Sequence, residues 1–313
     1  MNPNSTEIAC EFPYCLRIYK DGHVERLMGN ETTPPGTDPD TGVQSKDITI
    51  SSETGVSARL FLPKTINPKQ KLKLLIYIHG GAFCVASPFN PAYHNHVTTL
   101  AAKANVIALS VKYRLAPEHP LPIAYEDTWT AFQWVALHVN RNGPEAWLND
   151  HADFEHVFFA GDSAGANLAH NMAMQAAAEG LSGMKLDGIL LIHPYFRNNE
   201  PDICNKVMEY LYPTGMDDPR INAIIDPKLS SLGCSRVVVF VAEKDFIRDR
   251  GIAYYEALKN SGWSGVVELV DTEDEEHDFH LFHIVTGKIE VQSIHNQKAV
   301  ALVNKMVSFM TQS

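Results

Sequence analysis

Short apolar runs alternate with longer amphipathic segments along most of this chain. The runs are rich in Leu, Ile and Val, a pattern typical of strands that are buried on both faces of a sheet. Strands are predicted at 72–78, 105–111, 157–160, 188–192, 236–242 and 266–270. Helices are predicted at 91–104, 123–139, from the turn at 163 to about 178, at 249–260 and at 297–311. This alternation predicts an α/β fold, with a mostly parallel sheet covered by helices on both faces.

The N-terminal part of the chain follows another pattern. Residues 47–51 and 56–62 alternate apolar and polar positions on either side of Ser52-Glu53-Thr54-Gly55, which predicts a β-hairpin. Residues 12–19 fit either a short amphipathic helix or an edge strand. Residues 32–40 are rich in turn-forming residues and predict a loop.

The alternation also breaks between residues 193 and 232. A polar, proline-rich connection of this length is unusual in a compact domain unless it has a function. We interpret it as a small cap at the C-terminal edge of the sheet. The whole chain, 1–313, then forms a single α/β domain that carries this cap.

The composition argues against proteins that bind nucleic acids or membranes. The chain has 313 residues and a net charge of -11 without clusters of Lys or Arg, so neither a nucleic acid nor an anionic membrane is an expected partner. No apolar stretch has the length of a membrane span, and the first residues lack the pattern of a signal peptide. Five scattered cysteines without a CxxC pair fit reduced thiols and a cytoplasmic location. They are Cys10, Cys15, Cys84, Cys204 and Cys234.

The clearest chemical signal is Gly161-Asp162-Ser163-Ala164-Gly165, between the predicted strand 157–160 and the helix that follows. A serine on a sharp strand-to-helix turn projects its hydroxyl out of the sheet, and flanking glycines let strand and helix pack closely. The five residues alone also fit an ordinary Gly/Ser-rich turn. The strand before them and the helix after them favour a nucleophile.

A group that binds a developing negative charge is expected at His79-Gly80-Gly81-Ala82. This segment follows the strand 72–78 directly, and consecutive glycines allow backbone N–H groups to converge on one point. We predict the N–H groups of Gly80, Gly81 and Ala164 as the donors of an oxyanion hole. An ordinary Gly-Gly turn is the alternative.

A serine nucleophile also needs a carboxylate and a histidine, which follow it in that order in a strand–turn–helix site. Asp245 lies just beyond the strand 236–242, where the carboxyl end of a parallel strand reaches the site. Glu243 is the competing acid. His277 and His280 both follow the last strand, and their positions alone do not separate them.

These motifs together resemble the α/β-hydrolase superfamily in its hormone-sensitive-lipase-like branch. More narrowly, the chain is similar to the plant carboxylesterases, a group that includes 2-hydroxyisoflavanone dehydratases and gibberellin receptors. The resemblance implies that the first histidine of His277-Asp278-Phe279-His280 is the base. It also implies that residues 1–45 join the 193–232 connection in forming the cap. The matching segments are 79–83, 113–118, 161–167, 244–245 with 249–251, and 276–277 with 279–280.

The chain departs from that family at several positions. Ala82 stands where many relatives have a third glycine, and Asp278 stands where an apolar residue is usual. Asp278 completes an acidic run from Asp271, which is either a solvated loop or, through Glu276 and Asp278, a cause of a raised His277 pKa. The cap connection is short for the plant group, and the polar stretch 286–296 is additional.

The expected activity is hydrolysis of a small-molecule carboxylic ester by Ser163, His277 and Asp245 through an acyl-enzyme. Phe83, Tyr195 and Phe196 are candidate pocket walls, although each also fits core packing. No metal or cofactor is expected, and the chain is expected to be a monomer or homodimer.

A dehydratase, lyase or cyclase of a plant metabolite is the alternative to an ester hydrolase, because it would use the same oxyanion hole and histidine. A non-catalytic small-molecule receptor is a further alternative, against which the presence of His277 argues.

Overall fold

A central sheet of eight strands organises the computed structural model, which describes residues 7–64, 70–180, 183–212, 215, 218–285, 288–291 and 296–312. The strand order is β11-β10-β9-β8-β6-β7-β5-β4. Pairing is parallel from β11 to β7, whereas β5 and β4 are antiparallel. The bounds are β4 Gln44–Thr49, β5 Ser57–Leu62, β6 Leu72–Ile78, β7 Ile107–Lys112, β8 Ala152–Asp162, β9 Leu186–Ile192, β10 Arg236–Ala242 and β11 Val266–Thr272.

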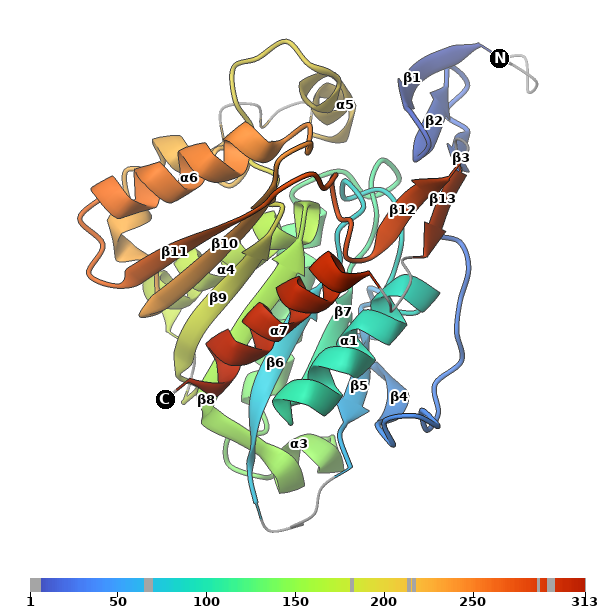
Figure 1. Ribbon diagram of the computed structural model, residues 1–313. Coiled ribbons are helices and arrows are strands. Elements are labelled where there is room, and N and C mark those ends of the chain that lie inside the picture. The colour runs from blue at the N-terminus through green and yellow to red at the C-terminus, as the bar shows by residue number, and fades with distance from the viewer. Residues whose placement is uncertain are drawn as a thin grey trace.

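Helices cover both faces of this sheet, as the apolar runs predict (Figure 1). One face packs against α1 and α7, and the other packs against α2, α4 and α6. A short helix that the sequence pattern does not predict, α3, precedes β8. The bounds of these helices are α1 Pro91–Ala104, α2 Ile123–Ala136, α3 Ala146–His151, α4 Ala164–Glu179, α6 Arg248–Asn260 and α7 Gln297–Thr311.

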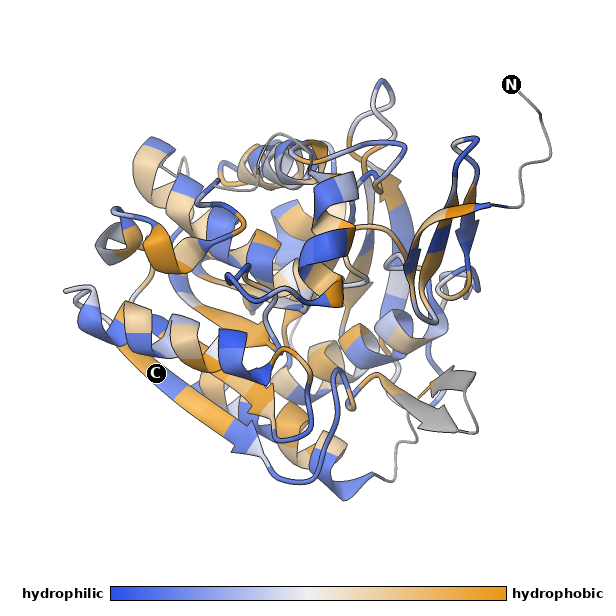
Figure 2. Cartoon of the chain, turned by 90° about the horizontal axis from the view of Figure 1, so that it is seen from above, coloured by the Kyte–Doolittle hydropathy of each residue, from blue (hydrophilic) through white to orange (hydrophobic). Residues whose placement is uncertain are grey.

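Hydropathy explains this layering (Figure 2). Apolar residues are concentrated in the central strands, and the helices carry both apolar and polar residues. Alternate residues of a strand point to opposite faces, so Leu74 and Ile76 join one core while Leu75 and Tyr77 join the other. Both cores are therefore assembled from the same strands. Among the residues that the structure describes, no helix combines the length and apolar character needed to cross a membrane.

Two segments lie above the upper edge of the central sheet in Figure 1. The first is an antiparallel sheet of β1 (Ile8–Phe12), β2 (Leu16–Tyr19) and β3 (Val24–Arg26), so the strand alternative for 12–19 is correct. The second is α5 (Ile203–Leu211), which contacts β1. We call β1–β3 and α5 the cap.

Helix α5 lies within the connection that the sequence pattern predicts only as a polar segment. Asp202 caps its N-terminus by accepting the N–H of Asn205, and Val207, Met208 and Leu211 turn inward. Two single-turn 3₁₀ helices follow at Ala223–Ile225 and Leu229–Ser231. Residues 213–214 and 216–217 of this connection lie outside the described residues.

A second β-hairpin occupies part of the additional polar stretch. Strands β12 (Phe282–Val285) and β13 (Lys288–Val291) pair antiparallel. Residues 286–287 and 292–295 of the predicted stretch lie outside the described residues. The hairpin therefore lies between the His277 loop and α7 along the chain.

Two glycines allow the Ser163 turn to pack directly on the neighbouring strand. A Cβ atom on Gly165 would lie 2.1 Å from the carbonyl oxygen of Ile78, and a Cβ atom on Gly161 would lie 2.4 Å from the backbone of Gly165. These contacts are with backbone atoms, which cannot move aside as a flexible side chain can. The glycines of the motif are thus required by packing.

We therefore expect Gly165→Ala to destabilise the protein by about 3 kcal/mol or more, because the added methyl group meets the β6 backbone. Chemical denaturation followed by circular dichroism measures this. Gly36→Ala is the matched control, because a Cβ atom there meets nothing within 4 Å. Equal stability of the two variants would contradict the packing argument.

Candidate active site

Ser163 lies on the turn between β8 and α4, with φ 50° and ψ -116°. This conformation is unusual for a residue other than glycine, and it is held by neighbouring backbone. The Ser163 N–H donates to the carbonyl of Ile192 at 2.8 Å, and the Ser163 carbonyl accepts the N–H of Tyr195 at 3.0 Å. The last residue of β9 and the segment after it therefore hold the turn from both sides.

Three predicted site residues meet at this turn. His277 Nε2 lies 3.0 Å from Ser163 Oγ, and His277 Nδ1 lies 2.9 Å from Asp245 Oδ2. The other oxygen of Asp245 accepts the N–H of Ile247 at 2.8 Å, which orients the carboxylate. Ser163, His277 and Asp245 follow β8, β11 and β10 respectively, so the parallel sheet brings them together.

The two competing candidates lie elsewhere. His280 is buried beside His96, with 5.0 Å between the ring centroids. Glu243 is exposed and accepts the N–H of Asp274 at 2.7 Å. Neither side chain takes the place of His277 or Asp245 in the contacts around Ser163.

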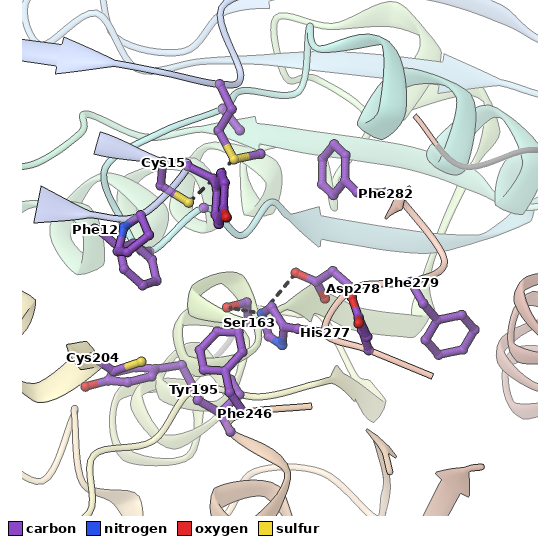
Figure 3. A pocket seen from close by; sticks show the side chains of 18 of the residues that line it. Phe12, Cys15, Ser163, Tyr195, Cys204, Phe246, His277, Asp278, Phe279 and Phe282 are labelled. Carbon is purple, nitrogen blue, oxygen red and sulfur yellow. Dashed lines mark hydrogen bonds and ion pairs between the residues drawn. The ribbon is translucent and has the colours of Figure 1, made fainter. Parts of the chain in front are cut away.

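A cavity of about 840 Å³ opens over Ser163 (Figure 3). Phe83 and Tyr195 line it, as predicted, but Phe196 does not. Phe196 is fully buried and stacks on Tyr254 with 4.5 Å between the ring centroids, so its core-packing alternative is the correct one. The walls that sequence reasoning missed come from the cap, the segment after β3, the loop after β10 and the start of β12; they include Phe12, Cys15, Met28, Ile203, Val207, Met208, Phe246 and Phe282.

The N–H of Gly80 does not face the cavity, which corrects its predicted role as an oxyanion donor. It donates to Asp162 at 3.1 Å and to the hydroxyl of Tyr93 at 3.1 Å, and Gly80 is absent from the cavity lining. Two acceptors, the buried carboxyl of Asp162 and the hydroxyl of Tyr93, therefore already take this N–H.

Gly81 and Ala82 line the cavity instead, and within the described part of the chain their N–H groups donate no hydrogen bond. Ala164 begins α4, so its N–H has no acceptor within the helix. Ala82 has φ 53°, a conformation that glycine adopts without strain. Gly81, Ala82 and Ala164 are the available donors near Ser163.

Asp162 links the serine turn to the loop of Gly80, Gly81 and Ala82 through the Gly80 N–H. Its fully buried carboxyl also accepts the hydroxyl of Tyr77 at 2.9 Å and that of Tyr93 at 2.7 Å. Burial and the charge of Asp278 raise the pKa of Asp162, although the tyrosine hydroxyls counteract this. Sequence reasoning assigned no separate role to Asp162.

The pKa of His277 is raised above the ordinary value for a histidine. Burial alone would lower its pKa, but Asp245 and Asp278 outweigh burial and raise the pKa to about 9. Asp278 Oδ2 lies 3.3 Å from His277 Nε2. Glu276 is exposed and is not among these groups. Much of the acidic run is therefore exposed, as the solvated-loop alternative describes, with part of it at the cavity edge, whereas Asp278 is buried beside His277.

Two groups of side chains among the described residues bring three ligand-type atoms within 4.8 Å of one another. They are His193 with Asp245 and His277, and His193 with Asp278 and His280. Both nitrogens of His277 and Nδ1 of His193 already take part in hydrogen bonds or ion pairs within the protein. We assign neither group as a metal site.

The chain belongs to a protein family described as alpha/beta hydrolase fold, which it matches over residues 75–281. It is also similar in structure to a hyperthermophilic esterase from Pyrobaculum calidifontis, with a TM-score of 0.68 and 27% identity. That likeness covers 86% of this chain and 85% of the esterase. The predicted fold is thus confirmed.

Two plant proteins are equally similar in sequence. The chain is 46% identical to a 2-hydroxyisoflavanone dehydratase of Glycyrrhiza echinata, covering 89% of this chain and 92% of the relative. It is also 46% identical to probable carboxylesterase 2 of Arabidopsis thaliana, covering 90% of this chain and 93% of the relative. The resemblance to the carboxylesterase and dehydratase group is therefore confirmed, and sequence identity does not separate the two activities.

If His277 is the base, ester hydrolysis should rise with pH through about 9, because its carboxylate neighbours keep the imidazole protonated below that pH. Asp278→Asn removes one neighbouring negative charge and should move the rise to lower pH by about one unit or more. The measurement is kcat/KM for a neutral ester between pH 6 and 10. Glu273→Gln, an exposed change in the same loop, is the control. Coincident profiles for wild type and Asp278→Asn would contradict this prediction.

Asp162→Asn should destabilise the protein by about 1–3 kcal/mol, because the amide cannot accept all three buried donors. We also expect a lower kcat, since the loop of Gly81 and Ala82 loses its attachment at Gly80. Thermal unfolding and ester kinetics measure the two effects. Asp150→Asn, at an exposed position on α3, is the control. Unchanged kcat in a destabilised Asp162→Asn would restrict its role to stability.

Proposed function

We propose that this chain is a carboxylic ester hydrolase that works through an acyl-enzyme on Ser163. The observation that carries the proposal is the chain of contacts from Ser163 Oγ to His277 Nε2 at 3.0 Å and from His277 Nδ1 to Asp245 at 2.9 Å. Both distances lie within hydrogen-bond range before any substrate is bound. The site therefore needs no rearrangement of these three side chains.

The reaction begins when Ser163 Oγ attacks the ester carbonyl and His277 takes the serine proton. The oxyanion is held by the N–H groups of Gly81 and Ala82, which line the cavity, and by that of Ala164, which follows the serine. His277 then gives its proton to the leaving alcohol, and water releases the acyl group by the reverse sequence. Asp245 orients the imidazole and stabilises its charged form.

The cavity favours an apolar, uncharged substrate. Its volume of about 840 Å³ suits a small molecule, and aromatic side chains supply much of its wall. Most charged residues at the lining are acidic, and its basic residue, Lys244, is paired with Asp274. A substrate with a negative charge near the reacting carbonyl would therefore be repelled by Asp278.

Dehydration of a β-hydroxy carbonyl compound is the second candidate. Its support is that a dehydratase and a probable carboxylesterase match this chain at the same 46% identity. Such a reaction would use the oxyanion hole to polarise the carbonyl and His277 to move a proton. Turnover of a 2-hydroxyisoflavanone by Ser163→Ala at the wild-type rate, with no detectable ester hydrolysis by wild type, would favour it over the hydrolase.

Ser163→Ala should lower kcat/KM for a p-nitrophenyl ester by about 10³-fold or more, because the nucleophile is lost. Wild type should also be labelled by a fluorophosphonate at Ser163, which mass spectrometry of the modified peptide detects. Asp245→Asn should retain labelling at a much lower rate, since the imidazole loses its orientation.

The matched control is Ser110→Ala, on the buried strand β7, because the Ser110 hydroxyl has no hydrogen-bond partner among the described residues. Its activity should equal that of wild type. Persistence of ester hydrolysis in Ser163→Ala would contradict the acyl-enzyme. Inertness of wild type to esters and to the fluorophosphonate, together with tight binding of a small ligand, would point to a receptor.

A further inference from the structure

A second carboxylate lies at the reactive nitrogen of His277. Asp278 Oδ2 is 3.3 Å from His277 Nε2, the nitrogen that also faces Ser163 Oγ at 3.0 Å. Asp245 already orients His277 from Nδ1. The imidazole is thus placed between two carboxylates, only one of which a Ser-His-Asp arrangement requires.

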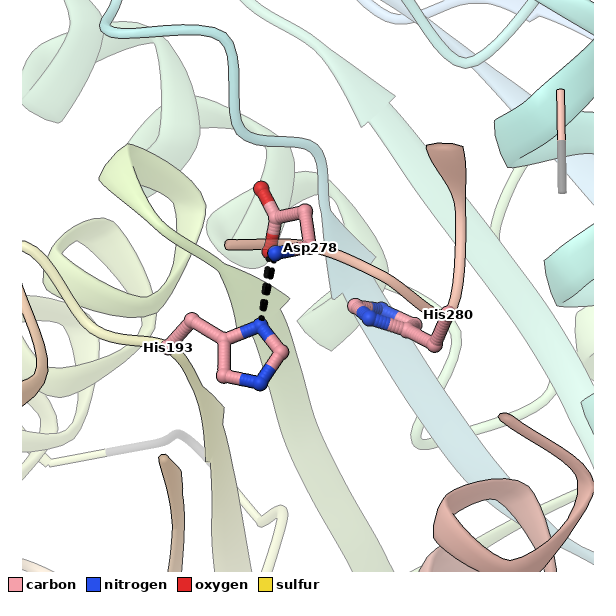
Figure 4. A group of neighbouring side chains, drawn as sticks. All are labelled: His193, Asp278 and His280. Atoms are coloured by element: carbon pink, nitrogen blue, oxygen red, sulfur yellow. Dashed lines mark hydrogen bonds and ion pairs between the residues drawn. The ribbon is translucent and has the colours of Figure 1, made fainter. Parts of the chain in front are cut away.

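The position of Asp278 is fixed by its backbone and by His193 (Figure 4). Asp278 has φ 52°, and it is 7% exposed while lining the cavity. His193 Nδ1 lies 3.0 Å from the Asp278 backbone nitrogen and 3.1 Å from Asp278 Oδ1. His193 Nδ1 accepts the backbone N–H when it carries no proton, and it donates to the carboxylate when it carries one. Both arrangements keep Asp278 beside His277.

This carboxylate hinders acyl transfer. Ser163 needs His277 Nε2 unprotonated, whereas a negative charge 3.3 Å away favours the protonated ring. The same contact assists chemistry that starts from an imidazolium and a carboxylate, because both groups are then in their reactive forms. The raised pKa of His277 agrees with this ion pair.

We propose that Asp278 is a catalytic base that removes a proton from the carbon next to a bound carbonyl group, while His277 is the matching acid. The pair would enolise a carbonyl compound and, where a β-hydroxyl group is present, expel it as water without using Ser163. This assignment rests on the second candidate function, dehydration, and adds to it the residue that removes the α-proton. It shares only His277 and the oxyanion donors with ester hydrolysis.

The proton and electron balance closes within the site. The α-carbon proton passes to the Asp278 carboxylate, and the electron pair of that C–H bond forms the new C=C bond as the β C–O bond breaks. His277 Nε2 gives its proton to the departing oxygen, which leaves as water. The carboxylic acid of Asp278 then returns its proton to neutral His277 across the 3.3 Å contact, and both residues regain their starting charge.

The charged and titratable groups around the pair come from several elements. Asp245 follows β10, Asp162 ends β8, His193 follows β9, and His280 lies on the same loop as the pair. Asp162 and Asp245 favour a charged His277. Burial lowers the pKa of His280, as do the neighbouring imidazoles, so His280 adds no positive charge at neutral pH.

Two probes test the proposal with the full chain. Exchange of the α-protons of 1-tetralone in D₂O, followed by ¹H NMR, reports proton abstraction alone. Loss of water from a 2-hydroxyisoflavanone, followed by ultraviolet absorbance, reports the complete elimination. Asp278→Asn and Asp278→Gly are the test variants, because asparagine and glycine both tolerate the positive φ. Glu273→Gln is the charge-matched control in the same loop.

We expect both Asp278 variants to lower exchange and elimination by about 10²-fold or more, and Ser163→Ala to keep both reactions. The same Asp278 variants should hydrolyse a neutral ester faster than wild type at pH 7, which also shows that they are folded. Exchange and elimination at wild-type rates in the Asp278 variants would overturn the proposal. So would their loss in Ser163→Ala, or their absence from wild type. Failure of ester hydrolysis alone would instead overturn the hydrolase.

Discussion

The buried carboxyl of Asp162 joins the two parts of the site that must act together. It lies one residue before Ser163 and accepts the N–H of Gly80 together with the hydroxyls of Tyr77 and Tyr93. The serine turn and the loop that begins at Gly80 are consequently held together, because a buried carboxyl that loses a donor costs stability. The glycines of the turn also allow it to pack closely on β6, because the β6 backbone leaves no space for a side chain at Gly165. Because the Gly80 N–H is bound to Asp162, the N–H groups of Gly81 and Ala82 are left to face the cavity.

His277 links Ser163 to two carboxylates, those of Asp245 and Asp278. Asp245 approaches one ring nitrogen and Asp278 approaches the other, so the imidazole lies between two negative charges. A base for serine and an acid for a leaving hydroxyl group make opposite demands on this ring. The fold alone does not choose between them, since proteins of this family include relatives named for either activity. The choice therefore depends on which protonation state the neighbours of His277 favour and on which carbonyl compound the cavity admits.

The cavity wall is built from segments that are far apart along the chain. Phe12 comes from the N-terminal strands, Val207 comes from α5, and Phe246 follows β10. Arg250, buried on α6, donates to the carbonyl of Phe196 at 3.0 Å and also pairs with Asp202 at the start of α5. This buried arginine fixes the cap connection to the central domain. Through Asp202, Arg250 also holds the start of α5, the helix that supplies Val207 to the cavity wall.

The sheet, its main helices and the order of the chemical groups could be predicted from the amino-acid pattern, because buried strands and amphipathic helices are periodic and strand ends mark the site. The pattern placed Ser163, Asp245 and His277 after three strands, and the structure brings them within hydrogen-bond distance. The pattern was wrong about one orientation, because the Gly80 N–H faces Asp162. It left two others open, which the structure decides: Phe196 packs in the core, and Asp278 reaches His277. They depend on where side chains and N–H groups point after distant segments pack, and no local periodicity records that direction.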